Sequence, residues 1–329
     1  MLPKTADIAA RSIAIKEDEP MPVLRDVFLL MSTNALMRKF VVGFPLSRRV
    51  SRRFVAGETL EEAIRIVKKL NQQCLQVTLD QLGESVTKEN EACEAKDGYL
   101  CALDAIAANK VASHVSVKLT QMGLDLSTDL CLDNMRQIVS KAKAIGTFTR
   151  IDMEDSKRTQ ATLNIYKTLH EEFDNVGVVI QAYLYRTEAD MQALLAMDAN
   201  VRLCKGAYKE PATVAFPKKK AVDANMIKMA QMFLQPSDKQ NGGYLALATH
   251  DEKIINWAKE YVAVNKVEHS RFEFQMLYGV RSDLQRKLAA EGYTVRVYVP
   301  YGTYWYPYLM RRLAERPANV FFLVSNLFK

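Results

Sequence analysis

Eight short runs rich in β-branched and aromatic residues recur from residue 74 onward, and each is followed by a segment of helical character. Strict alternation of strands and helices predicts a parallel sheet. Eight such units in roughly 250 residues fit a (β/α)₈ TIM-type barrel. The runs lie at 74–80, 114–119, 147–153, 176–184, 201–206, 244–250, 272–277 and 293–300.

The alternative α/β architecture is an open, doubly wound sheet. A dinucleotide-binding member of that class carries G-x-G-x-x-G between its first strand and helix, and a nucleotide triphosphatase carries G-x-x-x-x-G-K-[ST]. Neither pattern follows any of the eight runs. The sequence therefore favours the closed barrel.

The chain divides on sequence grounds into two parts. Residues 1–70 are expected to form an N-terminal arm followed by helices, and residues 71–329 the barrel. The last helix of the first part has Thr59 as a candidate cap with Glu62 three residues on, which is the capping-box spacing.

Charge limits the classes of partner. The net charge of +7 suits anionic ligands or an acidic membrane surface, but no basic stripe interleaved with aromatic residues indicates nucleic acid. Arg48, Arg49, Arg52 and Arg53 are expected on one helix face, where each could contribute about 1 kcal/mol to contact with anionic lipid.

Cysteine and histidine usage indicates a reducing compartment and no metal. The five cysteines show no C-x-x-C spacing, and the four histidines are not paired at helical spacing. No signal-peptide pattern opens the chain, and no uncharged apolar run approaches the roughly 18–20 residues that a spanning helix needs. We therefore expect a cytoplasmic protein without a transmembrane segment.

Polar side chains stand at nearly every predicted strand end. In a barrel the loops after the strands form the active face, so these side chains should converge. Lys118, Arg202 and Lys205 would converge with Arg311 and Arg312 of the last helix, against Asp152 and Glu315 as counter-charges, and this basic set predicts an anionic ligand. The side chains at the strand ends are Asp80, Glu84, Lys118, Asp152, Glu154, Gln181, Tyr183, Arg202, Lys205, Tyr208, Thr249, His250, Asp251, Gln275 and Tyr298.

The segment after the last run, YGTYWYPYLMRRLAE, predicts a helix from about Trp305. Its residues Tyr308, Arg311, Arg312 and Glu315 stand three or four positions apart and share one face. Paired guanidinium groups suit a planar carboxylate, because each binds two oxygens at once. We expect this helix to fold its polar face over the barrel mouth.

Several of these blocks resemble one family. VRLCKGAYKEP, SVKL, RIDME, VIQAYLYRT, ATHD, FEFQMLYG and YVPYGTYWYPYLMRRLAERPANV are similar to the corresponding segments of proline dehydrogenase, in its single-function bacterial form, over about residues 70–325. The resemblance implies oxidation of L-proline to Δ1-pyrroline-5-carboxylate, with hydride transfer to N5 of FAD and electrons passed to membrane quinone.

The resemblance also implies residue roles. Lys118, Arg311 and Arg312 would bind the proline carboxylate, Tyr298 would pack on the ring, and Leu277 would wall the pocket. Asp152 would orient Lys118, and Glu315 would orient the arginines. Arg202 would lie near N5 of the flavin. The other FAD-binding residues would be Gln181, Lys205, Gly206, Ala207, Tyr208, Thr249, His250 and Gln275.

The family's partners would be membrane quinone, an anionic membrane surface on the inner face of the cytoplasmic membrane, and a separate pyrroline-5-carboxylate dehydrogenase. Three alternatives stay open on sequence alone. Lys118 could form a Schiff base, as in a class I aldolase. The basic segment 38–53 could belong to a non-enzymatic lipid-binding module. A related flavin barrel reduces folate, although Arg311 and Arg312 favour a small amino-acid carboxylate.

Overall fold

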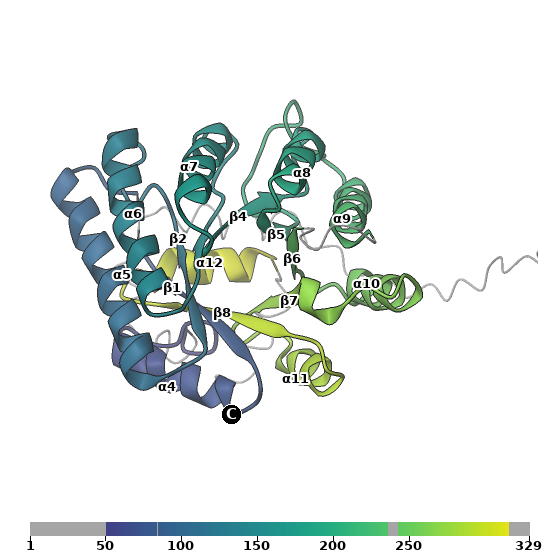
Figure 1. Cartoon of the computed structure of the whole chain (residues 1–329), viewed down its shortest axis with the longest axis horizontal. Helices are drawn as coiled ribbons and strands as arrows, with labels where there is room; N and C mark the ends of the chain where they lie inside the picture. The colour runs from purple at the N-terminus through teal and green to yellow at the C-terminus, as the bar shows by residue number, and fades with distance from the viewer. Residues whose placement is uncertain (1–50, 84, 236–242, 316–329) are drawn as a thin grey trace, which may run out of the picture. The chain divides into compact units, whose positions relative to one another are not determined.

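The computed structural model describes residues 51–83, 85–235 and 243–315 (Figure 1). The chain divides into two compact units, Phe44–Trp305 on the one hand and Met1–Gly43 with Tyr306–Lys329 on the other. The predictions for the N-terminal arm, for Glu84 and for two of the clustered arginines, Arg48 and Arg49, lie outside the described residues. The predicted boundary at residue 70 stays a prediction.

Eight parallel strands close into a barrel in the order of the sequence, with β8 hydrogen-bonded to β1. The predicted (β/α)₈ architecture is confirmed. The strands are β1 (Gln76–Gln81), β2 (Ser113–Val117), β3 (Thr149–Ile151), β4 (Val176–Gln181), β5 (Asn200–Cys204), β6 (Tyr244–Ala248), β7 (Phe272–Leu277) and β8 (Val295–Tyr301).

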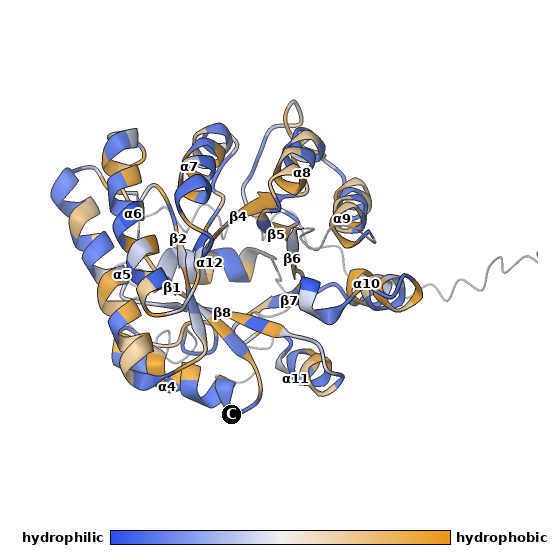
Figure 2. Ribbon diagram, in the orientation of Figure 1, coloured by the Kyte–Doolittle hydropathy of each residue, from blue (hydrophilic) through white to orange (hydrophobic). Residues whose placement is uncertain are grey.

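Helices connect successive strands and surround the barrel in Figure 1. The helices between the strands are α5 (Glu89–Asn109), α6 (Thr128–Ala144), α7 (Thr159–Glu172), α8 (Thr187–Ala196), α9 (Lys219–Leu234), α10 (Glu252–Val264) with a 3₁₀ turn (His269–Arg271), and α11 (Ser282–Ala290). The helix α4 (Leu60–Asn71) precedes β1, and α12 (Trp305–Glu315) follows β8. Figure 2 shows hydrophobic and hydrophilic residues alternating along these helices, as amphipathic packing requires.

The barrel strands separate apolar from polar side chains with a period of two. In β1, for example, Val77 and Leu79 belong to the hydrophobic core formed with the helices, whereas Thr78 and Asp80 are buried polar residues at the alternate positions. The apolar positions of all eight strands pack beneath the helices. The alternate positions leave an unusually polar barrel interior.

Buried charges fill the end of the interior at which the strands begin. Arg296 of β8 donates to Glu273 of β7 at 2.9 Å and to the carbonyl of Val77 at 3.0 Å. Arg150 of β3 donates to the carbonyl of Asn200 at 2.6 Å. These three charged side chains are at most 5% exposed. We call Arg150, Glu273 and Arg296 the base layer.

The helix α4 confirms the predicted capping box. Thr59 Oγ1 accepts from the backbone N–H of Glu62 at 3.3 Å, and Glu62 Oε2 accepts from that of Thr59 at 3.4 Å. The helix buries Ile64 and Val67 in the core shared with the barrel. These two hydrogen bonds satisfy backbone N–H groups at the helix start that have no partner within the helix, and so they fix where α4 begins.

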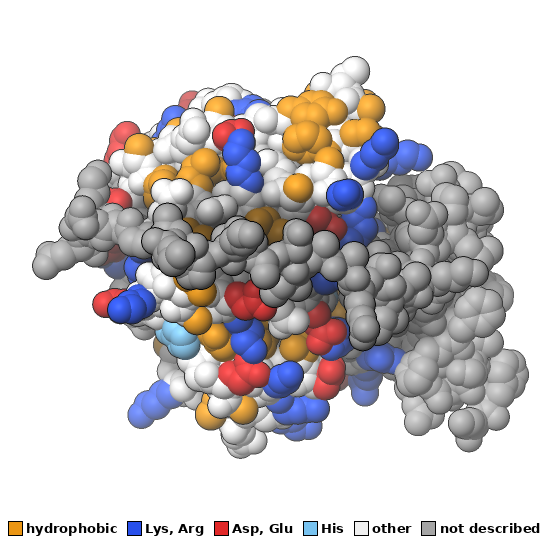
Figure 3. All heavy atoms as spheres, turned by 90° about the vertical axis from the view of Figure 1, so that its right-hand side faces the viewer, with side chains coloured by type: hydrophobic (Ala, Val, Ile, Leu, Met, Phe, Trp, Pro, Cys, Tyr) orange, Lys and Arg blue, Asp and Glu red, His pale blue; other side chains and the backbone are white. Residues whose placement is uncertain are grey.

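The described surface carries charges of both signs. In Figure 3 Lys/Arg and Asp/Glu side chains are interspersed over the visible face, and hydrophobic side chains gather near its upper edge. Arg52 and Arg53, the two described members of the arginine cluster, lie in a turn and not on a helix face. Among the described helices, none is long and apolar enough to cross a membrane.

Candidate active site

Four of the predicted site residues meet inside the barrel at the carboxyl ends of the strands. Lys118 and Asp152 directly follow β2 and β3, while Arg202 and Tyr298 lie within β5 and β8. Lys118 Nζ lies 2.7 Å from Oδ1 of Asp80 and 3.6 Å from Oδ2 of Asp152. The lysine is thus held between two carboxylates, of which Asp80 is the nearer.

Asp152 is the centre of this cluster. Its Oδ2 accepts a hydrogen bond from the hydroxyl of Tyr298 at 2.9 Å. Its Oδ1 accepts from Arg202 Nη1 at 2.8 Å and from Ser116 Oγ at 2.6 Å. One carboxylate therefore links the tyrosine and lysine on one side to the arginine on the other.

These contacts fix the charge states. Burial works against the charge of Lys118, but Asp80 and Asp152 outweigh it and hold the lysine pKa above its usual value. Burial likewise opposes ionisation of Asp152, yet Lys118 and Arg202 hold its pKa below the usual range. Burial, reinforced by both carboxylates, raises the pKa of Tyr298 well above its usual value. At neutral pH the lysine is a cation, Asp152 an anion and the tyrosine neutral.

Arg202 has more hydrogen-bond donors than the described residues satisfy. It is 6% exposed, and its guanidinium carbon lies 5.3 Å from the centroid of the Tyr298 ring. Among the described residues, its Nε and Nη2 atoms find no hydrogen-bond partner. A buried, unpaired donor costs about 1–3 kcal/mol. The described residues thus leave two buried donors of Arg202 without an acceptor.

The K-G-A-Y turn after β5 is shaped by an amide side chain. Gln181 donates through Nε2 to the carbonyl of Glu154 at 2.8 Å and accepts the backbone N–H of Ala207 at 3.2 Å. Gly206 has φ of +125°, and a Cβ there would lie 2.4 Å from the ring of Tyr183. Only glycine lets the backbone turn this closely past the tyrosine.

Lys205 is paired within the protein. Its Nζ lies 2.7 Å from Asp251 and 2.5 Å from Asp223. Asp251 also caps α10 by accepting the backbone N–H of Lys253 at 3.1 Å. The lysine therefore ties the turn after β5 to the start of α10.

The remaining residues predicted to bind the cofactor or substrate lie at the ends of β6 and β7. Thr249 is buried and accepts the backbone N–H of Asp251 at 3.1 Å. His250 Nε2 accepts the backbone N–H of Leu277 at 3.0 Å, so this nitrogen is unprotonated. Gln275 donates to Glu273 of the base layer, and so it faces into the barrel. Tyr208 is half-buried on the turn after β5.

The predicted arginines of the last helix belong to the other unit. α12 forms where the sequence predicts it, and the guanidinium carbon of Arg312 lies 5.1 Å from the ring centroid of Tyr308. Arg311 is half-exposed. The side chain of Glu315 lies outside the described part of the structure. That α12 covers the barrel mouth, with both arginines on one anion, stays a prediction.

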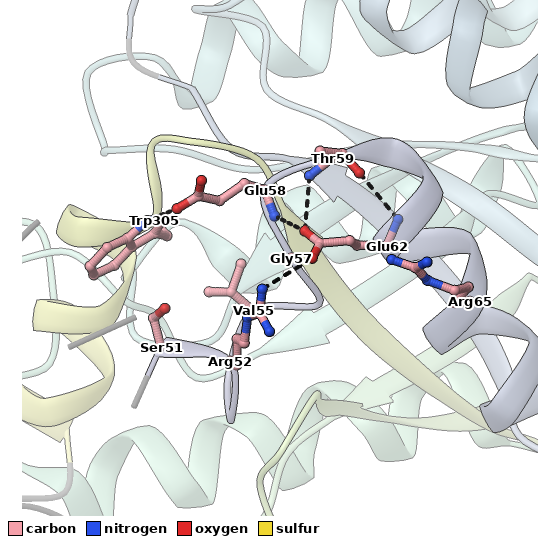
Figure 4. A pocket seen from close by; sticks show the side chains of 9 residues that line it. All are labelled: Ser51, Arg52, Val55, Gly57, Glu58, Thr59, Glu62, Arg65 and Trp305. Atoms are coloured by element: carbon pink, nitrogen blue, oxygen red, sulfur yellow. Dashed lines mark hydrogen bonds and ion pairs between the residues drawn. The ribbon is translucent and has the colours of Figure 1, made fainter. Parts of the chain in front are cut away.

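A separate cavity of about 390 Å³ adjoins the start of α4 and contains none of the predicted site residues. In Figure 4 the indole of Trp305 faces Glu58, to which its Nε1 donates at 3.1 Å. Arg52 pairs with Glu62 at 3.2 Å on the opposite side. Two arginines, Arg52 and Arg65, and two glutamates, Glu58 and Glu62, line this cavity.

The sequence did not predict the roles of two residues of this cluster, Asp80 and Ser116. Asp80 was expected at a strand end but was given no role, and Ser116 was not considered. The signal for Ser116 was its position two residues before Lys118 on one strand, where the pleat places both side chains on the same face. No group of three or more His, Cys, Asp or Glu side chains able to hold a metal occurs among the residues described, and all five cysteines are free thiols.

The fold and this site define a (β/α)₈-barrel protein with a buried, cation-bearing cluster at the carboxyl ends of its strands. Comparison with known proteins specifies the family. The family model "Proline dehydrogenase" matches residues 63–325. The chain is 46% identical over 307 residues to proline dehydrogenase 1 of Bacillus subtilis subsp. natto, covering 93% of this chain and 100% of that protein.

A second relative is the proline dehydrogenase of Deinococcus radiodurans, 43% identical over 285 residues, with 85% of this chain and 90% of that protein covered. Among solved structures, proline utilization A from Bdellovibrio bacteriovorus inactivated by N-propargylglycine aligns with a TM-score of 0.76 at 26% identity. The alignment covers 89% of this chain and 36% of the larger protein. This chain belongs to the proline dehydrogenase family and is an oxidoreductase of the single-function bacterial type.

Proposed function

We propose that this chain oxidises L-proline to Δ1-pyrroline-5-carboxylate with bound FAD and passes the electrons to membrane quinone. The observation that carries the proposal is the cluster of Lys118, Asp152 and Arg202. It offers buried positive charge at the barrel mouth, and two N–H groups of Arg202 have no partner among the described residues.

The residues present fit a flavin. The unpaired donors of Arg202 suit the electron-rich edge of the ring system, and the tight turn at Gly206 follows the end of β5, on which Arg202 stands. The cofactor would be held by Gln181, Arg202, Lys205, Gly206, Ala207, Tyr208, Thr249, His250 and Gln275. When bound, the flavin supplies the acceptor for two electrons from the carbon beside the proline nitrogen.

The chain's own residues would bind and orient the substrate. The cationic Lys118 is held by Asp80 and Asp152 where it can pair with a carboxylate. The ring of Tyr298, fixed by its bond to Asp152, offers an apolar surface to the pyrrolidine. We assign Arg311 and Arg312 to the same carboxylate, Leu277 to the pocket wall, and Glu315 to orienting the arginines.

Neither Lys118 nor Tyr298 is suited to take the proton of the proline amine. Both keep their own protons at neutral pH, because their pKa values lie above the usual ones. We therefore propose that proline binds with a neutral amine. Binding should then strengthen as pH rises toward the pKa of the free amine.

The protonated state of Lys118 also argues against the aldolase alternative. A Schiff base needs a neutral amine, whereas this lysine is ion-paired at 2.7 Å to Asp80. The lipid-binding alternative has no enzymatic role and conflicts with membership of an oxidoreductase family. The folate alternative is disfavoured by Arg311 and Arg312, which suit a small carboxylate.

The location of the protein and its partners are proposed from its membership of the family. We place the protein in the cytoplasm and peripherally on the inner face of the membrane, where anionic lipid and quinone are available. A separate pyrroline-5-carboxylate dehydrogenase would take the product. The described structure adds one relevant observation, namely helices too short or too polar to span a membrane.

The test is the visible spectrum of the purified protein. A yellow protein whose flavin band bleaches when L-proline is added without oxygen is the expected result. Pipecolate, with a larger ring, and glutamate, without a ring, should leave the band unchanged. A colourless preparation, or a flavin band that proline does not bleach, would overturn the proposed function.

A further inference from the structure

Ser116 lies at the centre of the barrel interior, although no part of the proposed function uses it. It is fully buried in β2, at 0% exposure. Its hydroxyl donates to Oδ1 of Asp152 at 2.6 Å and accepts from Nη1 of Arg202 at 3.1 Å. The same Nη1 atom donates to the same Oδ1 atom at 2.8 Å. The hydroxyl, carboxylate and guanidinium thus form a closed triangle.

This triangle determines which way Arg202 presents its remaining donors. A guanidinium is planar and rigid, so holding one terminal nitrogen fixes the directions of all its N–H groups. With Nη1 held by Asp152 and Ser116, the atoms Nε and Nη2 are the ones left without a partner among the described residues. The orientation of the unpaired donors is therefore set by two acceptors and not by one.

The strand position of Ser116 is itself fixed from outside the barrel. Tyr99 of α5, 1% exposed, donates its hydroxyl to the carbonyl of Ser116 at 2.9 Å. Side chain and main chain of the serine are both engaged. A hydroxyl anchored in this way loses little further entropy in holding its partners.

We propose that Ser116 is a positioning residue for proline oxidation, whose hydroxyl locks Arg202 onto Asp152 so that the free donors of Arg202 face the flavin. This inference rests on the proposed function and extends it to a residue that does not touch the substrate. Serine suits the task because one hydroxyl can donate to a carboxylate and accept from a guanidinium at the same time.

The charge on Asp152 gives the inference a pH signature. The hydrogen bond from Ser116 is one of the contacts that stabilise the ionised carboxylate, so its loss weakens ionisation. Activity that requires the anion would then fail at a higher pH as the solution is acidified. The ionisable groups that act on Asp152 from the surrounding elements are Asp80 (β1), Tyr99 (α5), Lys118 (after β2), Arg202 and Cys204 (β5) and Tyr298 (β8).

The experiment compares Ser116→Ala, Ser116→Thr and the control Ser113→Ala in the flavin-loaded protein. Ser113 is also buried in β2, but its hydroxyl donates to the carbonyl of His114 and touches none of the cluster. The measurements are the rate of anaerobic flavin reduction by proline from pH 5 to pH 9, the affinity for proline, and the midpoint potential of the bound flavin. Ser116→Thr keeps the hydroxyl and serves as the rescue variant.

Ser116→Ala should slow reduction by roughly tenfold to a hundredfold, the range for a hydrogen bond to a charged group, while the affinity for proline changes less. In Ser116→Ala the reduction rate should begin to fall at a higher pH than in wild type when the solution is acidified. The midpoint potential of its flavin should become more negative, because Arg202 no longer stabilises the reduced flavin. Ser116→Thr and Ser113→Ala should both stay close to wild type.

Two results would overturn the inference while leaving the proposed function intact. One is wild-type behaviour of Ser116→Ala in rate, pH profile and potential, with proline still bleaching the wild-type flavin. The other is a Ser116→Thr variant as impaired as Ser116→Ala, which would assign the effect to packing. A wild-type protein that proline does not reduce would overturn the proposed function, and the inference with it.

Discussion

Within the barrel interior, Arg202 uses some of its N–H donors in hydrogen bonds to the protein and leaves others unpaired among the described residues. Asp152 and Ser116 hold one nitrogen, and two others have no partner among the described residues. Lys118 is more fully paired, since two carboxylates flank it. On the proposed function, we expect the arginine to contact its ligand through the unpaired donors and the lysine to contact it through its positive charge.

Arg202→Met should lower the rate of flavin reduction by roughly a hundredfold or more, as losses of a fixed charge at a reacting centre do. Proline affinity should fall much less, because Lys118 keeps its charge and its place. Stopped-flow reduction and equilibrium titration with proline separate the two effects. Arg136→Met, on an exposed arginine paired with Glu172, is the matched control. Equal reduction rates in Arg202→Met and wild type would refute this role.

At the scale of the element, turns and caps determine where strands give way to helices. Gly206 lets the turn after β5 pass Tyr183, and Asp251 both caps α10 and pairs with Lys205. The ends of β5 and β6 are thus followed by residues that fix the course of the loop. We expect the backbone of these loops to shape the site together with the charged side chains.

Gly206→Ala should reduce the amount of flavin that copurifies with the protein. The added Cβ would lie 2.4 Å from the Tyr183 ring, at a φ of +125°. Gly146→Ala is the control, because Gly146 also has positive φ, at +69°, but open space around it. The control should lose only about 1–2 kcal/mol of stability, the cost of a left-handed backbone, and keep its flavin. The ratio of flavin to protein absorbance measures the difference, and equal ratios in the two variants would contradict the prediction.

Thr59→Ala should destabilise the protein by about 0.5–2 kcal/mol, since it removes the side-chain half of the capping box on α4. Denaturant unfolding followed by circular dichroism measures the loss. Thr213→Ala, on an exposed loop residue, should change the free energy of unfolding by less than about 0.5 kcal/mol. Equal denaturant midpoints for Thr59→Ala and Thr213→Ala would show that the cap does not stabilise the protein.

The elements were predictable from sequence because their signals are local. Short runs rich in β-branched and aromatic residues located all eight strands, and the Thr59–Glu62 spacing located the start of α4. The pairing of Lys118 with Asp80 was not predictable, because it joins residues 38 positions apart and depends on how β1 and β2 stand in the barrel. Ser116 was missed for the same reason, since its partners come from β3 and β5.

On the scale of the whole molecule, the barrel interior is organised in two polar levels. The site cluster occupies the end where the strands finish, and the base layer of Arg150, Glu273 and Arg296 occupies the other. Sequence analysis did not predict the base layer, since barrel interiors are more often filled by branched apolar residues. Its pairing between β7 and β8, with a bond onto β1, helps to hold the barrel closed.

Glu273→Gln should destabilise the barrel by about 3–5 kcal/mol, because it leaves the buried Arg296 without its counter-charge. Burial opposes ionisation of Glu273, but Arg296 outweighs it and holds the glutamate pKa below its usual value. The stabilisation is therefore present above the unfolded-state pKa, and is lost as pH falls through the lower, folded-state pKa. The difference in unfolding free energy between wild type and Glu273→Gln should therefore become smaller at acidic pH.

Thermal unfolding between pH 3 and pH 8 measures that gap. Glu291→Gln is the control, since Glu291 pairs with Lys259 near the surface at 30% exposure and should contribute at most about 1 kcal/mol. A gap that stays constant with pH would show that the charge of Glu273 does not carry the effect.

The base layer has a consequence for turnover. Because arginines and a glutamate are packed across one end of the barrel, we expect a small molecule to enter the interior from the opposite end. Incoming substrate and outgoing product must then use one passage in turn. We expect the product to compete with proline for the emptied site, so that accumulating product raises the apparent KM and leaves the maximal rate unchanged.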